Sequence, residues 1–224
     1  MEAKGQCVLS VIPVRSEAKS KAEIVTQLLF GETYTVITHG TEWLEIQIDF
    51  DGYTGWISAN QFSEPQFKAA GIVFKDKFEI IEDIIVPFGG SLPVQTEYAN
   101  EPITTLAKRL LGSPYLWGGK TFMGIDCSGF MQVIHKAKSI ALPRDASQQA
   151  KLGIEVGFQD RKPGDLAFFG NAKGKVNHVG LLVSQDEIIH ASGEVRIDPF
   201  SIHGIVHAST GNQTHELFEI RRLK

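Results

Sequence analysis

Cysteine is scarce in this chain of 224 residues, which holds only Cys7 and Cys127. Two thiols so far apart in the sequence cannot build a disulfide scaffold or a four-cysteine zinc site. Long apolar runs are also missing, since no stretch approaches the ~18 residues that a membrane-spanning helix needs. The first residues, Met1–Gln6, carry no apolar signal region. We therefore expect a protein that stays inside the cell, unless a signal has been trimmed.

An excess of basic charge is the third absence. The chain carries 22 Lys and Arg against 26 Asp and Glu, a net charge of −4, and has no basic tract to follow a phosphate backbone. Nucleic acid is therefore not an expected partner. The charge is unevenly divided: residues 1–64 hold 4 basic and 9 acidic side chains, and residues 65–224 hold 18 and 17. This asymmetry suggests two units with different tasks.

The first third of the chain is rich in short β-type segments separated by turn signals. Alternating or β-branched stretches favour five strands, at Cys7–Val14, Val25–Leu29, Tyr34–Thr38, Trp43–Ile48 and Gly55–Ile57. Five short strands in this space predict a small all-β barrel, which we assign to residues 1–64. Residues 65–100 are predicted to form a bridging segment or a degenerate second barrel. Within them, Pro87–Pro93 has the composition of a linker.

From Pro102 onward the periodicity becomes helical. Pro102–Leu111 has apolar residues at helical spacing and stops at Gly112, and a second helix follows Gly124–Gly129. The apolar face of this second helix comprises Phe130, Val133, Ile134 and Ala137. Strand candidates come next, at Asp165–Phe169, His178–Ser184, Glu187–His190, Val195–Ile197 and Leu217–Arg221. The order predicts an α+β domain over residues 101–224, with helices packed on an antiparallel sheet.

Cys127 stands at the start of the second predicted helix. The positive end of the helix dipole favours a thiolate there, and thiolate is the nucleophilic form of cysteine. His178 and His190 lie on neighbouring predicted strands, an arrangement typical of a thiol hydrolase with one histidine as base and the other orienting it. Because the two histidines are an even number of positions apart, they share a face only if the turn near Gln185–Glu187 has odd length or a bulge. Taken singly, each of these residues is more often structural than catalytic.

Six sequence blocks around these residues resemble the NlpC/p60 family of cell-wall cysteine peptidases. They are Tyr115–Gly119, Asp126–Phe130, Leu142–Gln149, Pro163–Phe169, His178–Leu181 and Ile189–Ser192, in the order of the family. The resemblance spans roughly residues 102–198. It implies a papain-like core with Cys127 as nucleophile, His178 as base and His190 as orienting residue.

The resemblance also implies substrate-binding roles for four residues of this domain: Tyr115, Asp126, Ser128 and Ser147. The Tyr115 hydroxyl is a candidate donor to the oxyanion, or a packing residue beside Trp117. Asp126 is a candidate acceptor for a substrate ammonium and also a suitable helix N-cap. Ser147 either contacts substrate or belongs to a turn or cap.

The front third resembles bacterial SH3-like barrels through Gln27–Glu32 and Asp51–Ile57. In recycling peptidases that join such barrels to this core, the barrel forms one wall of the cleft and holds a free N-terminal amine. Glu23 and Tyr53 are the candidates for this role, together with Asp126. The alternatives are a solvated surface acid for Glu23 and barrel core for Tyr53.

These features predict a cysteine peptidase that hydrolyses the γ-D-glutamyl–diamino-acid bond of peptidoglycan peptides and prefers a free N-terminal L-Ala. Two rival hypotheses are a wall-anchored hydrolase whose barrel binds intact peptidoglycan, and an amidase that cleaves between muramic acid and L-Ala. No cofactor or metal is predicted. Cys7 is interpreted as core, and the histidines outside the motifs as structural or exposed. They are His39, His135, His203, His207 and His215.

Overall fold

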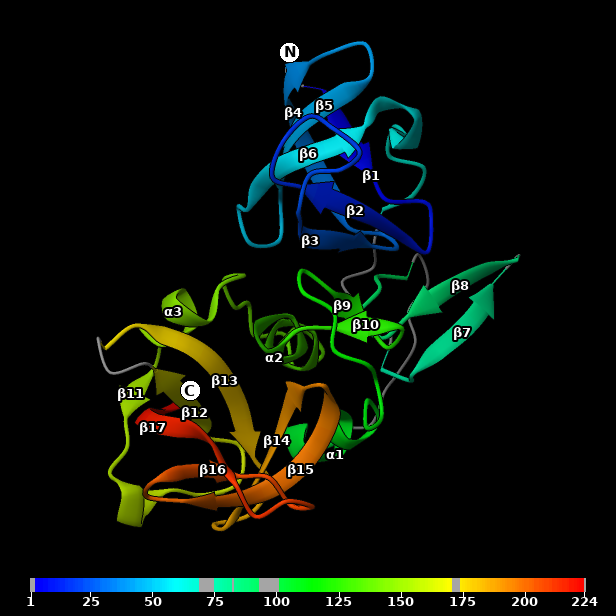
Figure 1. Ribbon diagram of the computed structural model, residues 1–224. Coiled ribbons are helices and arrows are strands. Elements are labelled where there is room, and N and C mark those ends of the chain that lie inside the picture. The colour runs from blue at the N-terminus through cyan, green and yellow to red at the C-terminus, as the bar shows by residue number, and fades with distance from the viewer. Residues whose placement is uncertain (1–2, 69–74, 82, 93–100, 171–173, 224) are drawn as a thin grey trace.

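The chain folds into an N-terminal barrel that rests on a larger unit of strands and helices (Figure 1). The computed structural model describes residues 3–68, 75–81, 83–92, 101–170 and 174–223. Within these residues, no helix is long and apolar enough to cross a membrane.

The barrel contains six strands, one more than the sequence predicts. They are β1 (Lys4–Gln6), β2 (Val11–Arg15), β3 (Ile24–Leu29), β4 (Thr33–His39), β5 (Trp43–Ile48) and β6 (Thr54–Ser58), followed by the 3₁₀ turn η1 (Ala59–Gln61). Their spatial order is β1-β4-β5-β6-β2-β3, and every pair is antiparallel. Along β5, Leu44, Ile46 and Ile48 point inward at the predicted period of two.

The first predicted strand is wrong in its bounds. Cys7 lies just after β1 rather than in a strand, and Val11 begins the next one. The interpretation of Cys7 as core is confirmed, because its side chain is fully buried among the barrel residues. Burial, followed by the nearby Glu32 carboxylate, raises the pKa of this thiol to about 12. Cys7 is therefore held as an unreactive thiol.

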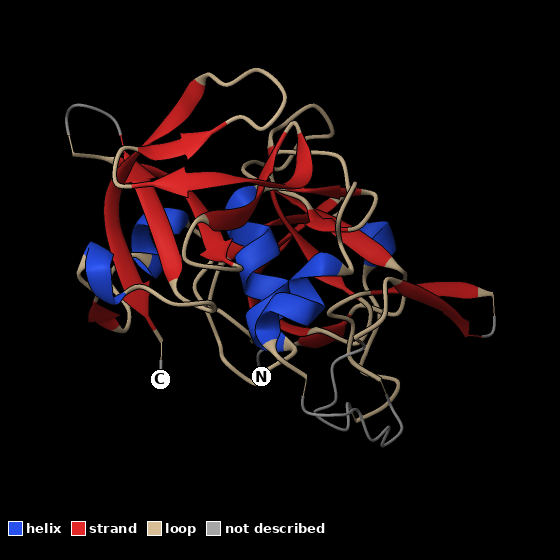
Figure 2. Cartoon of the chain, turned by 90° about the horizontal axis from the view of Figure 1, so that it is seen from below, coloured by secondary structure: helices blue, strands red, loops and turns tan. Residues whose placement is uncertain are grey.

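A two-stranded hairpin, β7 (Phe78–Ile81) and β8 (Ile84–Pro87), forms the regular structure among the described residues of the bridging segment. It projects from the side of the molecule in both views (Figures 1 and 2). The prediction of a linker from Pro87 is wrong as far as residue 92, because Phe88 and Leu92 are buried. The second-barrel alternative depends partly on residues 69–74, 82 and 93–100, which lie outside the described residues. The domain boundaries stay a prediction.

The C-terminal unit is mostly sheet. Its helices are α1 (Ile103–Lys108), α2 (Cys127–Lys136) and α3 (Ala146–Gln149), with the 3₁₀ turn η2 (Phe158–Asp160). A small hairpin, β9 (Lys120–Thr121) and β10 (Gly124–Ile125), precedes α2. The main sheet contains β11 (Ile154–Glu155), β12 (Leu166–Gly170), β13 (Val176–Leu182), β14 (Glu187–Ser192), β15 (Glu194–Ser201), β16 (Gly204–Val206) and β17 (Gln213–Arg222). The strand order is β11-β17-β12-β13-β14-β15-β16, and β16 also pairs with β17.

Helix α2 lies between the barrel and the main sheet (Figure 1). Its predicted apolar face, which includes Phe130, Val133 and Ile134, packs in the core against β13 and β14. The opposite face is buried as well, and from it Gln132 and Lys136 bond to Asp51 and Glu32 of the barrel. The expected arrangement of several helices on a sheet therefore holds chiefly for α2, since α1 and α3 are short.

A buried charge cluster fixes the barrel to α2. The Glu32 carboxylate of the barrel accepts from Lys136 Nζ at 2.6 Å and lies 3.3 Å from Lys120 Nζ, and all three side chains are buried. Burial acts to raise the pKa of Glu32, but the two ammonium groups prevail and lower it to about 2. Glu32 is therefore ionised, and its ion pairs connect the turn after β3 to α2.

Candidate active site

Cys127 is the first residue of α2, directly after the N-cap residue Asp126. The Asp126 carboxylate accepts the backbone N–H of Gly129 at 2.7 Å, which confirms its predicted N-cap role. The Cys127 sulfur lies close to β13, where the backbone N–H of Val179 acts to lower the pKa of the thiol. The start of α2 thus places the thiol next to β13, the strand that carries His178.

The electrostatic state of Cys127 differs from the sequence-based expectation. We expected the helix N-terminus to favour a thiolate, but burial and then the adjacent Asp126 carboxylate raise the pKa of the thiol to about 12. The side chain is only 6% exposed, so desolvation of the charged form outweighs the helix dipole. In the free protein Cys127 is a neutral thiol and needs a base.

His178 on β13 and His190 on β14 share one face of the sheet. Gly180 pairs directly with His190. Just beyond β13, Val183 still donates its N–H to the carbonyl of Glu187 at 3.0 Å, which leaves a three-residue turn, Ser184–Asp186. This turn has an odd number of residues, as the even spacing of the two histidines requires if they are to share a face of the sheet. His178 Nε2 lies 2.8 Å from His190 Nδ1, a hydrogen bond that leaves His178 Nδ1 for the thiol proton.

Asp198, on β15, extends this chain of side chains and was missed by the sequence analysis. Its carboxylate lies 2.9 Å from His190 Nε2 and also accepts from Arg196 Nε at 2.8 Å and from the backbone N–H of Ala208 at 3.0 Å. Asp198 is fully buried. Strand alternation could have indicated Asp198. Across the tight β14–β15 turn it pairs with Ile188, and it therefore lies on the same face of the sheet as His190.

Burial keeps both histidines neutral. It lowers the pKa of His190 to about 4, although Asp198 acts in the opposite direction. Burial, followed by the neighbouring His215 and His190, holds the pKa of His178 well below its ordinary value. A neutral imidazole beside a neutral thiol can accept the proton when sulfur attacks a carbonyl carbon.

His215, which we interpreted as structural or exposed, lies in the site. Its ring stacks on His178 with centroids 4.0 Å apart and an interplanar angle of 23°. Ligand atoms of His178, His190 and His215 lie within 4.8 Å of one another, close enough to consider a metal ion. However, stacked rings direct their in-plane lone pairs along parallel lines, and His190 uses both nitrogens in hydrogen bonds. This donor set fits a hydrogen-bonded relay better than a metal site.

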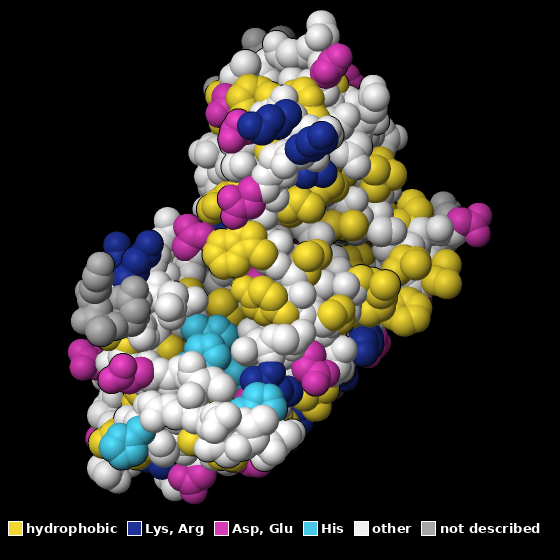
Figure 3. Space-filling view, viewed as in Figure 1, with side chains coloured by type: hydrophobic (Ala, Val, Ile, Leu, Met, Phe, Trp, Pro, Cys, Tyr) yellow, Lys and Arg dark blue, Asp and Glu magenta, His cyan; other side chains and the backbone are white. Residues whose placement is uncertain are grey.

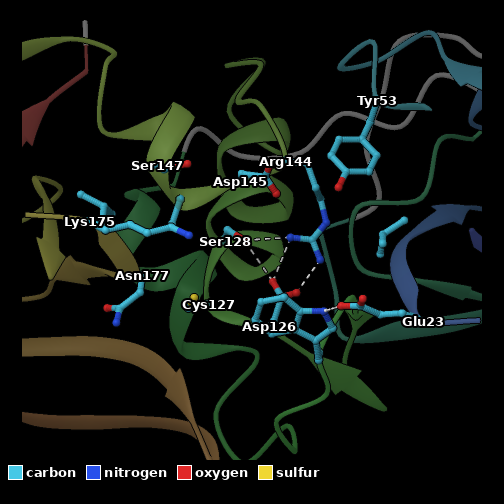
Figure 4. A pocket seen from close by; sticks show the side chains of 14 residues that line it. Glu23, Tyr53, Asp126, Cys127, Ser128, Arg144, Asp145, Ser147, Lys175 and Asn177 are labelled. Atoms are coloured by element: carbon cyan, nitrogen blue, oxygen red, sulfur yellow. Dashed lines mark hydrogen bonds and ion pairs between the residues drawn. The ribbon is translucent and has the colours of Figure 1, made fainter. Parts of the chain in front are cut away.

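A pocket of about 440 Å³ opens between the barrel and the catalytic unit beside Cys127 (Figure 4). The barrel contributes Glu23 and Tyr53, and the catalytic unit contributes Cys127, Ser128 and Ser147. The structure thus brings together all but one of the predicted substrate-binding residues. The exception is Tyr115.

Tyr115 lines a second pocket of about 390 Å³, together with Ser192, Thr214 and His215. Asn177 lines both pockets, and His178 lines the second one. Burial, followed by the nearby Cys127 and Asp126, raises the pKa of Tyr115 to about 12. Its hydroxyl therefore stays protonated and can donate a hydrogen bond.

On the surface, histidine side chains are visible beneath a band of apolar side chains next to the barrel (Figure 3).

Asp126 is fully engaged within the protein. Arg144 forms a buried ion pair with it, with Nη2 2.5 Å from one oxygen and Nη1 3.0 Å from the other. The N–H groups of Gly118 and Gly129 and the hydroxyl of Ser128 also donate to this carboxylate. An ammonium from substrate would have to compete with all of them. The predicted ammonium contact of Asp126 is therefore not favoured by the geometry.

Asp145 is the carboxylate that faces the pocket in place of Asp126. It lines the cavity with Glu23 and Tyr53, and its charge contributes, after burial, to the raised pKa of Tyr53. Asp145 lies in the block Leu142–Gln149, but no role was predicted for it. Glu23 accepts the indole N–H of Trp117 at 2.5 Å, which fixes its carboxylate at the pocket edge.

Comparisons with known proteins agree with this geometry. A profile described as the NlpC/P60 family matches residues 112–213, and a profile described as the bacterial dipeptidyl-peptidase SH3 domain matches residues 14–62. A gamma-D-glutamyl-L-lysine dipeptidyl-peptidase of Bacillus subtilis is 32% identical over 213 residues, covering 75% of this chain and 72% of the relative. A protein of the same name from Bacillus cereus is 25% identical, covering 84% and 74%.

The fold is also found among solved structures. An NlpC/P60 family protein from Bacillus cereus superposes with a TM-score of 0.82 over 98% of this chain and 99% of that chain, at 20% identity. Profile, sequence and fold therefore converge on one assignment. This chain belongs to the NlpC/P60 family of cysteine peptidases and carries an N-terminal bacterial SH3-like domain.

Proposed function

We propose that this peptidase hydrolyses the γ-D-glutamyl–diamino-acid bond of peptidoglycan-derived peptides that begin with a free L-Ala. The main observation is the pocket in which the thiol of Cys127 and the carboxylates of Glu23 and Asp145 face the same cavity. Two acids beside a tyrosine provide charge-assisted partners for an ammonium group. The names of the two Bacillus relatives agree with a short γ-D-glutamyl peptide as substrate.

In the proposed reaction, the sulfur of Cys127 attacks the γ-carbonyl carbon of D-Glu while His178 takes the thiol proton. The developing oxyanion is stabilised by backbone N–H groups at the start of α2 and by the Tyr115 hydroxyl. The C–N bond then breaks, His178 returns the proton to the leaving amine, and a thioester remains on Cys127. Water, activated by His178, hydrolyses the thioester and releases L-Ala-D-Glu.

His190 and Asp198 contribute to this reaction without touching the substrate. Asp198 accepts from His190 Nε2, which leaves His190 Nδ1 as the acceptor for the N–H of His178 Nε2. This relay fixes His178 in the tautomer whose unprotonated nitrogen faces the thiol. It also stabilises the imidazolium that forms during the reaction.

The amine contact is tested by acetylation of the substrate. We expect the N-acetylated tripeptide to be cleaved at least ~10-fold more slowly than the free peptide, because acetylation removes two charge-assisted hydrogen bonds. Glu23→Gln should reduce the ratio between the cleavage rates of the free and the acetylated peptide. Glu17→Gln, on an exposed part of the barrel, should leave this ratio unchanged. Equal rates for both peptides, or faster cleavage of intact peptidoglycan, would instead favour the wall-anchored hydrolase.

A further inference from the structure

The proposed reaction gives no task to His215, although its ring lies against the ring of the base. The centroids of His215 and His178 are 4.0 Å apart and their planes are inclined by 23°, so a flat surface covers one face of the His178 ring. The ring of His190 meets the same ring at 5.0 Å and 84°, edge to face. His190 holds an atom of the base by a hydrogen bond, whereas His215 holds its plane.

The plane of the His178 ring needs such a contact. For histidine the torsion about the Cβ–Cγ bond has broad minima, so the side chain does not fix its own plane. The hydrogen bond to His190 holds Nε2, which lies close to the axis of this rotation. Nδ1, the atom left for the thiol proton, lies farther from the axis. A rotation that barely lengthens the bond to His190 therefore displaces the atom that must meet the thiol.

His215 is itself held in place by its neighbours in the sheet. It pairs with Ile205 across β16 and β17, and a side chain at Gly204 would collide with its carbonyl oxygen. Its Nδ1 lies 2.9 Å from the hydroxyl of Thr214, and the ring of Phe169 meets its ring at 5.9 Å and 65°. The stacked ring is therefore a fixed surface for His178 to rest on.

The stacked ring is also uncharged at neutral pH. Burial, followed by the positive charge of Arg196, lowers the pKa of His215 below its ordinary value, although the Asp198 carboxylate acts in the opposite direction. A protonated ring in this position would oppose the imidazolium that forms on His178 during attack, whereas a neutral ring does not. His215 can thus support the base without adding a charge that opposes proton transfer.

We propose that His215 is a positioning residue, whose ring holds the plane of His178 so that Nδ1 faces the thiol of Cys127. The proposal rests on the role of His178 as base in the proposed function, and adds a second contact that fixes this base. It requires a flat side chain at position 215 and not an imidazole as such. This requirement separates positioning by stacking from a role in metal binding or hydrogen bonding.

Three substitutions of His215 test this requirement on L-Ala-γ-D-Glu-L-Lys. We expect His215→Ala and His215→Leu to lower kcat by at least ~10-fold with less than ~3-fold change in KM, because the base is present but misplaced. His215→Phe restores a flat ring and should keep kcat within ~3-fold of the wild-type value. His203→Ala, at an exposed position between β15 and β16, is the matched control and should leave kcat and KM unchanged.

Alkylation of Cys127 by iodoacetamide tests the positioning without a peptide substrate. A neutral thiol reacts through proton loss to a base, so the rate depends on His178. Removing a side chain beside the site widens the access of the reagent, so a purely structural role of His215 predicts faster alkylation in His215→Ala. Positioning predicts alkylation at least ~10-fold slower in His215→Ala at neutral pH, with the wild-type rate restored in His215→Phe. The buried thiol of Cys7, followed in the same sample by peptide mass, reports unfolding.

Unchanged or faster alkylation of Cys127 in His215→Ala, while Cys7 stays protected, would overturn the proposal. Equal losses of kcat in His215→Phe and His215→Ala would overturn it as well. If Cys7 is alkylated in His215→Ala, the same comparison is made with His215→Leu, which fills more of the space without a flat face. If the wild type does not cleave the tripeptide, the proposed substrate fails and the alkylation rates alone decide on His215. If His215→Ala cleaves it at the wild-type rate, the proposed function stands and the positioning role fails.

Discussion

At the scale of single residues, the active site is a buried relay of neutral groups. Cys127, His178 and His190 are nearly or fully buried, and the line of hydrogen bonds ends at the carboxylate of Asp198. The charge separation needed for attack therefore arises during the reaction and not in the resting protein. The effect of each relay member should appear mainly in kcat.

Asp198→Asn tests the end of this relay. An asparagine can keep a contact to the N–H of Ala208, but it removes the charge that stabilises the imidazolium and permits the wrong His190 tautomer. We expect kcat to fall by at least ~10-fold with a smaller change in KM. Steady-state kinetics and a melting curve measure both properties. Asp186→Asn, at an exposed ion pair with Arg161, is the control and should leave kcat unchanged.

The role of a residue could be predicted from the sequence where that residue lies within a motif. Cys127, His178 and His190 stand in such blocks. In the structure His178 and His190 lie in hydrogen-bond contact, and Cys127 lies close to Val179, the residue after His178 on β13. Strand alternation was the signal for Asp198, and Asp145 stands in a motif block without a predicted role. His215 reaches the site through the position of β17, which no local pattern encodes. The protonation state of Cys127 could not be predicted either, because it depends on burial by segments distant in the sequence.

At the scale of elements, the β13–β14 hairpin sets the geometry of the two histidines. Gly180 stands directly opposite His190, and a Cβ at this position would lie 3.0 Å from His190 Cβ and 2.7 Å from Ile188 Cδ1. The absence of a side chain thus leaves the space in which the His190 ring stands. The spacing of the histidines predicted the odd loop, but the need for this glycine appears only in the folded hairpin.

Gly180→Ala should displace His190 and weaken its hydrogen bond to His178. We expect at least ~10-fold loss of kcat together with a loss of stability of about 1–3 kcal/mol from overpacking. Gly157→Ala is the control, because a Cβ there meets one flexible carboxylate at 3.3 Å. Full activity of a folded Gly180→Ala protein would show that the hairpin tolerates the added methyl group.

At the scale of the whole molecule, the barrel is a structural part of the active site. It covers one face of α2, supplies Glu23 and Tyr53 to the pocket, and is fixed by the Glu32 cluster. The barrel and the catalytic core could be predicted from strand spacing and motifs. The resemblance also predicted the barrel as one wall of the cleft. The ion cluster that fixes it could not be predicted, because Glu32 is distant in the sequence from Lys120 and Lys136.

Glu32→Gln tests the connection between the two units. The change leaves the buried Lys120 and Lys136 without a carboxylate, so we expect a loss of about 3–5 kcal/mol in the free energy of unfolding. Denaturant unfolding measures it. Glu17→Gln removes an exposed pair with Lys19 and should change stability by no more than about 0.5 kcal/mol. An equally small effect of Glu32→Gln would show that the cluster does not hold the units together.

Stability should also depend on pH through the buried histidines. Burial lowers the pKa values of His135 and His190 to about 4, whereas the unfolded chain has ordinary values near ~6.5. Between these values the unfolded state binds more protons, so the stabilisation is complete above ~6.5 and is lost as pH falls toward 4. Unfolding curves from pH 7 to 5 measure this slope. His135→Gln, outside the catalytic relay, should make it shallower, and an unchanged slope would contradict the account.

The most direct test of the central claim is the mass of the products formed from L-Ala-γ-D-Glu-L-Lys or its diaminopimelate counterpart. The account predicts L-Ala-D-Glu and the free diamino acid with the wild type, and no turnover with folded Cys127→Ala, because the thiol forms the acyl intermediate. Cleavage at another bond, or turnover by Cys127→Ala comparable to that of the wild type, would contradict it.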